Sequence, residues 1–186
     1  DNVLPFWLEH SQDHEYGGYF TCLDREGKVF DTDKFIWLQS REVWMFSMLY
    51  NKVENRQEWL DCAIQGGEFL KKYGHDGDYN WYFSLDRSGR PLVEPYNIFS
   101  YTFATMAFGQ LSLATGNQEY ADIARKTFDI ILSKVNNPKG KWNKLHPGTR
   151  NLKNFALPMI LCNLALEIEH LLDENYLRET METCIH

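Results

Sequence analysis

The sequence predicts an all-α fold that forms part of an α/α barrel, in which a ring of outer helices surrounds a ring of inner helices. Two observations predict this layout. Residues 57–63 and 118–124 share four of seven identities at a spacing of 61 residues, which indicates an internal repeat. Within each repeat, a segment that is apolar nearly all round adjoins a segment that is apolar on one face. A helix that is apolar on every side is buried on every side, so the first kind of segment is expected in the inner ring.

The expected helices follow from this distinction. The inner helices are predicted over residues 35–50, 98–113 and 157–172. Outer helices are predicted over residues 59–73 and 120–135, where the apolar side chains recur at helical spacing on one face. A helix remnant at residues 6–10 and a faint echo of the repeat at residues 176–180 complete the set.

Two short runs of strand-forming residues, 18–23 and 81–85, each precede a turn of the pattern Asp-Arg-x-Gly. The turns are Asp24–Gly27 and Asp86–Gly89. We expect both runs to form β-hairpins, inserted between helices at one mouth of the barrel. The alternative is a plain helical bundle with decorated loops.

Residues 1–186 are interpreted as a single domain that supplies about half of a closed ring. An open half-ring exposes the apolar sides of its inner helices to water, at a cost of about 25 cal/mol per Å². We therefore expect a C-terminal half, or a partner such as a second copy of the chain in a homodimer, to cover the open seam. The chain starts at Asp1 without a Met and stops at His186 without a helix-ending residue, so we expect the protein to continue beyond both.

Composition restricts the function. The net charge of −7 and the pI of about 5.4 argue against binding to nucleic acid and to anionic membrane surfaces. Aromatic residues make up 15% of the chain, which favours a cavity whose flat rings stack on a sugar. The four cysteines form no CxxC pair and the histidines show no metal-binding spacing, which predicts free thiols in a reducing cytoplasm and no metal or other cofactor.

Candidate site residues gather at the predicted starts of the inner helices. Trp37 and Arg41 are four residues apart and therefore share a helical face, where Arg41 is expected to donate to sugar hydroxyls or to a developing oxyanion. The alternative for Arg41 is an internal salt bridge, for instance to Glu42 or Glu94. Tyr101 is expected at the same opening, and so is Lys153, for which exposure to solvent is the alternative. Asn97, also expected there, has the alternative role of a helix cap.

These motifs together resemble the N-terminal half of the N-acylglucosamine 2-epimerase family. The matching elements are Phe6-Trp7, His10-Ser11-x-Asp13, Gly17-Gly18, Asp24-Arg25-x-Gly27, Lys34-x-x-Trp37-x-Gln39-x-Arg41 and Pro158-Met159-Ile160-Leu161. The resemblance implies an (α/α)6 barrel of roughly twice this length, and epimerisation of a sugar at C2 through proton transfer and an enediolate. It places Arg41 in the catalytic cavity, with Trp37 and Lys153 as weaker correspondences.

The sequence also departs from the pattern of the family. The family's two catalytic histidines belong to a C-terminal half that this sequence does not contain, so the 186 residues alone are expected to be inactive. Leu157-Pro158-Met159 stands where the cellobiose-specific branch has a further histidine, which favours N-acylglucosamine-type members. Two other functions stay open. A glycoside hydrolase or lyase needs two carboxylates beside the cavity, for which Asp76, Asp78 and Glu94 are candidates, and a non-catalytic domain would bind protein through the seam.

Overall fold

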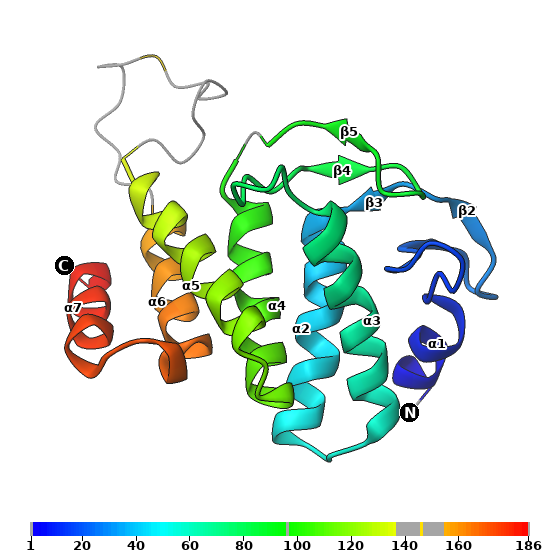
Figure 1. The fold of residues 1–186 in the computed structure, drawn as a ribbon, viewed down its shortest axis with the longest axis horizontal. Coiled ribbons are helices and arrows are strands. Elements are labelled where there is room, and N and C mark those ends of the chain that lie inside the picture. Colours follow the sequence, from blue (N-terminus) through cyan, green and yellow to red (C-terminus); the bar gives the residue numbers. More distant parts are fainter. Residues whose placement is uncertain (1, 96, 137–145, 147–154, 186) are drawn as a thin grey trace.

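The computed structural model describes residues 2–95, 97–136, 146 and 155–185. Helices account for most of this structure, and short strands lie at one end of them (Figure 1). In chain order the elements are α1 (Val3–His10), β1 (Cys22–Leu23), β2 (Val29–Asp31), β3 (Lys34–Phe35), α2 (Ile36–Lys52), α3 (Gln57–Tyr73), β4 (Ser84–Leu85), β5 (Pro91–Val93), α4 (Phe99–Thr115), α5 (Gln118–Ser133), α6 (Ala156–Glu167), the 3-10 turn η2 (Glu169–Leu171) and α7 (Glu174–Ile185).

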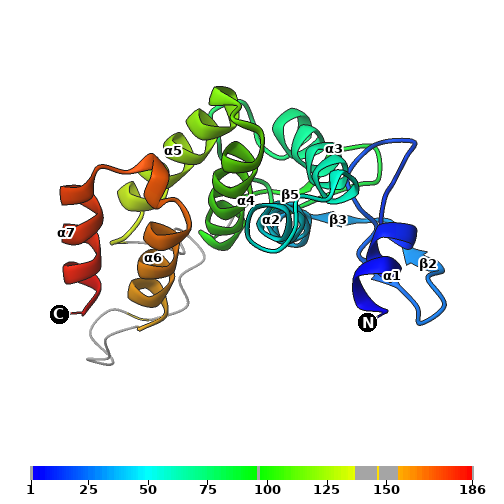
Figure 2. The ribbon, with the colours of Figure 1, turned by 90° about the horizontal axis from the view of Figure 1, so that it is seen from below.

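The helices form two layers of an open arch. Helices α2, α4 and α6 stand next to one another along the inner side, and α3, α5 and α7 lie outside them (Figure 2). Helix α2 packs against α3 and α4, α4 packs against α5, and α6 packs against α7. The predicted half-ring of inner and outer helices is therefore confirmed.

Burial distinguishes the two layers as the apolar patterns predict. Helix α4 buries 12 of its 17 residues, on all sides, whereas α5 buries only 7 of 16, on one face. Between them, Gly116 adopts the left-handed conformation that ends a helix (φ 68°), and the Asn117 side chain accepts the Glu119 N–H to cap the next one. None of the helices in the described part of the chain has the length and apolar character that crossing a bilayer requires.

The third inner helix differs from its prediction. A single helix was expected over 157–172, but α6 ends at Glu167 and the 3-10 turn η2 follows it. Only Leu161, Leu164 and Ala165 of α6 are buried, and Met159 and Leu166 are about half exposed, at 56% and 49%. The side of α6 that an enclosed inner helix would bury is therefore open, as expected at the end of a half-ring.

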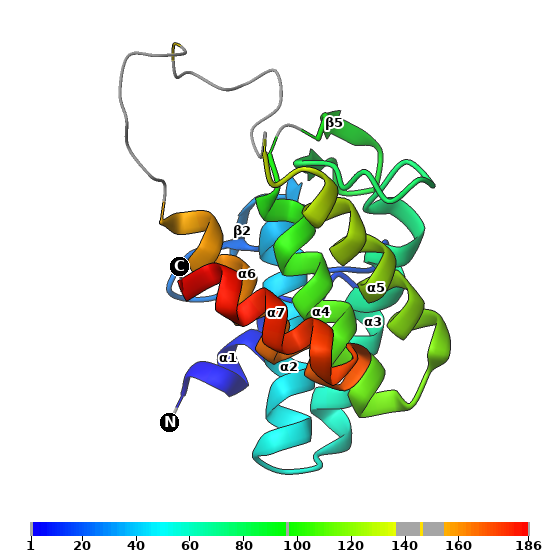
Figure 3. The ribbon, with the colours of Figure 1, turned by 90° about the vertical axis from the view of Figure 1, so that its left-hand side faces the viewer.

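The two predicted hairpins are present. Strand β1 pairs with β2 and β4 pairs with β5, both antiparallel, and Figure 3 shows β5 at one end of the helices. Each Asp-Arg-x-Gly turn has its glycine at a positive φ, 84° at Gly27 and 96° at Gly89, which only glycine adopts freely. Strand β3, which leads directly into α2, also pairs with β4 and so joins the first repeat to the second.

Candidate functional site

The first inner helix carries the candidate site. Trp37 and Arg41 lie one turn apart in α2, and the Arg41 guanidinium carbon lies 5.4 Å from the Trp37 ring centre and 4.5 Å from the Phe103 ring centre. Arg41 is exposed in the half-ring. No described residue forms a salt bridge with Arg41. Of the two carboxylates considered for that role, Glu42 accepts a hydrogen bond from Ser11, and Glu94 is exposed in a loop. The internal salt bridge that was the alternative for Arg41 is therefore absent from the described residues.

A hollow of about 340 Å³ lies beside this group at the hairpin end of the inner helices, and we call it the mouth hollow. Its walls are mainly aromatic, with two small polar side chains from the start of α4. Phe83 reaches it from the segment before β4, where its ring packs 5.7 Å from Phe35. The lining residues are Trp37, Arg41, Phe83, Asn97, Phe99, Ser100 and Phe103.

A second hollow of about 350 Å³ lies on the other side of Arg41 and Phe103, between the three inner helices, and we call it the inner hollow. Aliphatic and thioether side chains dominate its walls. The lining residues are Arg41, Trp44, Thr102, Phe103, Met106, Met159, Ile160, Asn163 and Leu164. The two hollows share Arg41 and Phe103, so one guanidinium group reaches both.

A hydrogen-bond network links the three inner helices beside the inner hollow. The Glu167 carboxylate accepts from Trp44 Nε1 at 3.0 Å and from Gln110 Nε2 at 2.9 Å. Asn51 in turn donates to the Gln110 side chain at 3.0 Å. Because its N–H is used by Glu167, Trp44 can present only its apolar ring to the hollow.

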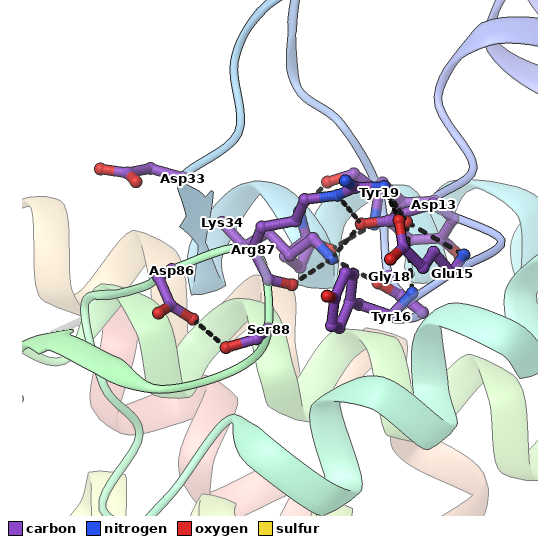
Figure 4. Close-up of polar contacts among 12 residues, drawn as sticks. Asp13, Glu15, Tyr16, Gly18, Tyr19, Asp33, Lys34, Asp86, Arg87 and Ser88 are labelled. Atoms are coloured by element: carbon purple, nitrogen blue, oxygen red, sulfur yellow. Dashed lines mark hydrogen bonds and ion pairs between the residues drawn. The ribbon is translucent and has the colours of Figure 1, made fainter.

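A buried ion cluster holds the hairpin end in place (Figure 4). Lys34 Nζ donates to Asp13 Oδ2 at 2.9 Å and to the Arg87 carbonyl, also at 2.9 Å, and both the Lys34 and the Asp13 side chains are completely buried. Arg87 adds two bonds to the same carboxylate. Despite its burial, Asp13 has a pKa lowered to about 2 by these hydrogen bonds and by the Lys34 charge. The cluster ties the start of α2, which carries Trp37 and Arg41, to the β4–β5 hairpin.

A third, smaller hollow of about 180 Å³ lies on the α1 side of α2, and we call it the seam hollow. It is lined by Trp7, Thr21, Leu38, Arg41, Glu42 and Met45. Burial raises the pKa of Glu42 to about 8, and the hydrogen bond from Ser11 offsets this only in part. The hydroxyl of Thr21 is buried and has no hydrogen-bond partner among the described residues. On this side of the site, burial therefore favours the neutral form of a carboxyl group.

The other predicted site residues have different positions. Tyr101 is buried away from the mouth and inner hollows, with its hydroxyl 2.9 Å from Lys134 Nζ and 3.3 Å from Asn80 Oδ1. It is therefore not brought together with Trp37 and Arg41. Asn97 lines the mouth hollow and also accepts the Phe99 N–H at 2.8 Å, so both of its predicted roles have geometric support. Lys153 lies outside the described residues.

The carboxylates considered for a hydrolase are not paired beside the hollows. Asp76, Asp78 and Glu94 are exposed in loops, and none lines the mouth hollow or the inner hollow. Among the described residues, no group of three or more His, Cys, Asp or Glu side chains is arranged to hold a metal ion.

Sequence reasoning missed several residues of the site. Phe83 was assigned only to a hairpin, although its place next to the second Asp-Arg-x-Gly turn put it at the mouth. Phe103, Trp44 and Asn163 were counted only as parts of inner helices. Helical spacing would have found Trp44, which lies seven residues after Trp37 and three after Arg41 and so shares their helical face.

Known proteins resemble this chain in sequence and in fold. A family model described as N-acylglucosamine 2-epimerase (GlcNAc 2-epimerase) matches residues 18–186. The N-acylglucosamine 2-epimerase of Bos taurus is 42% identical over 173 residues, which are 90% of this chain and 41% of that protein. The enzyme of the same name from Mus musculus is 39% identical and matches 100% of this chain and 46% of its own length.

A solved structure shows the same fold. Cellobiose 2-epimerase from Spirochaeta thermophila DSM 6192 superposes with a TM-score of 0.80 at 23% identity, over 98% of this chain and 49% of that one. The chain thus spans less than half the length of the curated relatives described above, and about half of this barrel structure.

Proposed function

Because the chain belongs to the N-acylglucosamine 2-epimerase family, we propose that it forms one wall of the active site of a sugar 2-epimerase. The substrate would be an aldose such as N-acetylglucosamine, interconverted with N-acetylmannosamine. The observation that carries this proposal is the position of Arg41, which lies between two hollows and against two aromatic rings, without a carboxylate partner among the described residues.

The chemistry requires a group that stabilises negative charge. A base removes the proton from C2, the electron pair of the C2–H bond forms a C1=C2 double bond, and the π electron pair of the C1 carbonyl moves onto its oxygen, which becomes an oxyanion. Return of a proton to the opposite face of C2 gives the epimer. A guanidinium group offers several N–H donors and a permanent charge, and a charged donor to an oxyanion contributes more than a neutral one. Arg41 is assigned this role.

The walls of the mouth hollow suit a sugar. Trp37, Phe99 and Phe103 line it with aromatic rings, a side-chain type on which the apolar C–H faces of a hexose can stack. Asn97 and Ser100 add a carboxamide and a hydroxyl that can exchange hydrogen bonds with sugar hydroxyls. A site of this composition binds by stacking and orients by a few polar groups, as small-molecule sites generally do.

The proton-transferring bases are proposed to lie outside this chain. The curated relatives are more than twice as long as the segment matched here, and we propose that a second half-ring closes the barrel and carries the catalytic histidines. The 186 residues alone are then inactive. A reducing compartment such as the cytoplasm suits the four cysteines, which are free.

Hydrogen exchange at C2 tests this function. The protein that contains this chain, incubated with N-acetylglucosamine or N-acetylmannosamine in heavy water, is expected to incorporate deuterium at C2. Replacing one charged donor of an oxyanion typically lowers kcat by about 10²–10³-fold, so Arg41→Ala should lose most of the exchange. Arg25→Ala, at an exposed position in the β1–β2 turn, is the matched control and should exchange at the original rate. Failure of the unmodified protein to exchange C2 hydrogen in any aldose would refute the proposal.

A further inference from the structure

We propose that the inner hollow binds the acyl group of an N-acylated 2-amino sugar, while the mouth hollow binds the rest of the sugar chain. This inference rests on the proposed function, because it places C2 of the substrate next to Arg41. It goes beyond that function by assigning a substituent of the substrate to particular residues.

Arg41 lies at the border between the mouth hollow and the inner hollow. In an N-acylated 2-amino sugar the amide nitrogen is bonded to C2, and C2 is bonded to the carbonyl carbon C1. A guanidinium group that contacts the C1 oxygen therefore has the acyl group on one side and carbons C3 to C6 on the other. Of the three hollows that Arg41 borders, the mouth hollow and the inner hollow also share Phe103, and together they offer room for a substituent on each side of the guanidinium group.

The chemistry of the walls decides which hollow takes which part. Carbons C3 to C6 carry hydroxyls, and these suit the mouth hollow, where Asn97 and Ser100 lie beside aromatic faces. An acyl chain ends in a methyl group, which suits the inner hollow between Met106, Met159 and Leu164. Thioether side chains are flexible and adapt to chains of different length.

Polar partners in the inner hollow match a single amide. Trp44 and Gln110 have their N–H groups bonded to Glu167 and are not available to a ligand. The Asn163 side-chain nitrogen Nδ2 instead lies 3.9 Å from the sulfur of Met106, which is a weak hydrogen-bond acceptor. An acyl carbonyl oxygen would readily replace this sulfur as the acceptor. Apart from Arg41 and Thr102, whose hydroxyl donates to the Phe99 carbonyl, the hollow therefore offers one carboxamide donor, which matches one amide carbonyl followed by a hydrocarbon tail.

The size of the hollow leads to a quantitative expectation. At about 350 Å³ the inner hollow has room for more than an acetyl group. Each additional methylene that becomes buried should raise affinity about fourfold, which corresponds to about 0.8 kcal/mol. The proposal therefore predicts that N-propanoyl and N-butanoyl glucosamine bind at least as well as the N-acetyl compound.

Two variants in the full-length protein test the assignment. Met159 is 56% exposed in this chain, so Met159→Ala and Met159→Phe should fold. We expect Met159→Phe to lower kcat/KM for the N-butanoyl compound at least fourfold more than for the N-acetyl compound, and Met159→Ala to shift the preference the other way. Asn163→Ala should weaken binding of every N-acyl sugar about tenfold and leave the binding of glucose unchanged. Phe99→Ala, in the mouth hollow, should weaken all of these sugars equally.

Binding and exchange must be measured in parallel, by the tryptophan fluorescence of Trp37 and Trp44 and by C2 deuteration. An unchanged acyl-chain profile in both Met159 variants would overturn the inference even when the enzyme exchanges C2 hydrogen normally. Absence of exchange with a retained, Met159-dependent chain-length profile would instead refute the proposed function and support the acyl site. Absence of binding by any N-acyl sugar would refute the acyl site.

Discussion

Replacement of Glu42 by Gln should make the protein more stable at alkaline pH. Glu42 is 8% exposed, and its carboxyl accepts a hydrogen bond from the Ser11 hydroxyl and lies near the Tyr19 hydroxyl and the Cys62 thiol. Gln keeps the size of the side chain and keeps an oxygen that accepts from Ser11, but it cannot ionise. The substitution therefore removes the titration of this site and leaves its packing intact.

The size of the change in the free energy of unfolding follows from the pKa of Glu42. Burial raises the pKa of Glu42 from 4.5 to about 8, so between these values the folded protein holds a proton that the unfolded chain releases. The free energy of unfolding then falls by about 1.4 kcal/mol for each pH unit, or by about 4 kcal/mol between pH 5 and pH 8. The stability that the neutral carboxyl contributes is complete below pH 4.5 and is lost as the pH rises to 8.

The measurement compares denaturant unfolding of the unmodified protein and the Glu42→Gln variant from pH 5 to pH 8. The two should unfold at similar denaturant concentrations at pH 5, and the variant should be more stable by about 4 kcal/mol at pH 8, with unchanged m-values. Glu26→Gln, at an exposed position in the β1–β2 turn, is the matched control. Stability curves that run parallel for the Glu42→Gln variant and the unmodified protein would show that Glu42 ionises freely and is hydrated.

Two further substitutions test the packing around the site. Lys34→Met leaves the buried Asp13 carboxylate without its ammonium partner and should lower the free energy of unfolding by about 3–5 kcal/mol, measured by denaturant titration. A loss below 1 kcal/mol would show that water reaches the cluster. Gly66→Ala would place a methyl group 2.2 Å from the Tyr19 hydroxyl, which donates to the Cys62 carbonyl, and should cost about 1–3 kcal/mol. An unchanged thermal midpoint would contradict this packing.

The alternation of helices could be predicted from the sequence because it is a local property. Helical periodicity and all-round apolarity are both visible in a window of about 15 residues, and they gave the inner helices α2 and α4 to within two residues. Helix α6 was predicted too long, because the apolar residues Ile168, Leu171 and Leu172 recur at helical spacing although the backbone leaves the α-helix at Glu167. Apolarity indicates burial, and it does not by itself fix where a helix ends.

Contacts between distant segments could not be predicted in this way. Strand β3 has two residues and pairs with a strand about 50 residues later, and no pattern in so short a segment indicates its partner. Lys34 was noted only as part of a motif, because a lysine is almost never fully buried unless it is paired. Its burial depends on Asp13 and Arg87, which lie 21 and 53 residues away.

The orientation of the inner helices affects how much of the proposed oxyanion stabilisation Arg41 must supply. The α2 and α4 N-termini both lie at the hairpin end (Figure 1). Residues of their first two turns, Trp37, Arg41 and Ser100, line the mouth hollow. A helix N-terminus carries a partial positive charge that stabilises a nearby anion by about 0.3–1 kcal/mol. A hydrogen-bond donor aimed at an oxyanion contributes about 3–4 kcal/mol. In the proposed reaction the helix ends would therefore assist in stabilising the oxyanion, but they would not replace the guanidinium group. Arg41→Lys, which keeps the charge and loses the planar fork of donors, should recover only part of the C2 exchange that Arg41→Ala loses.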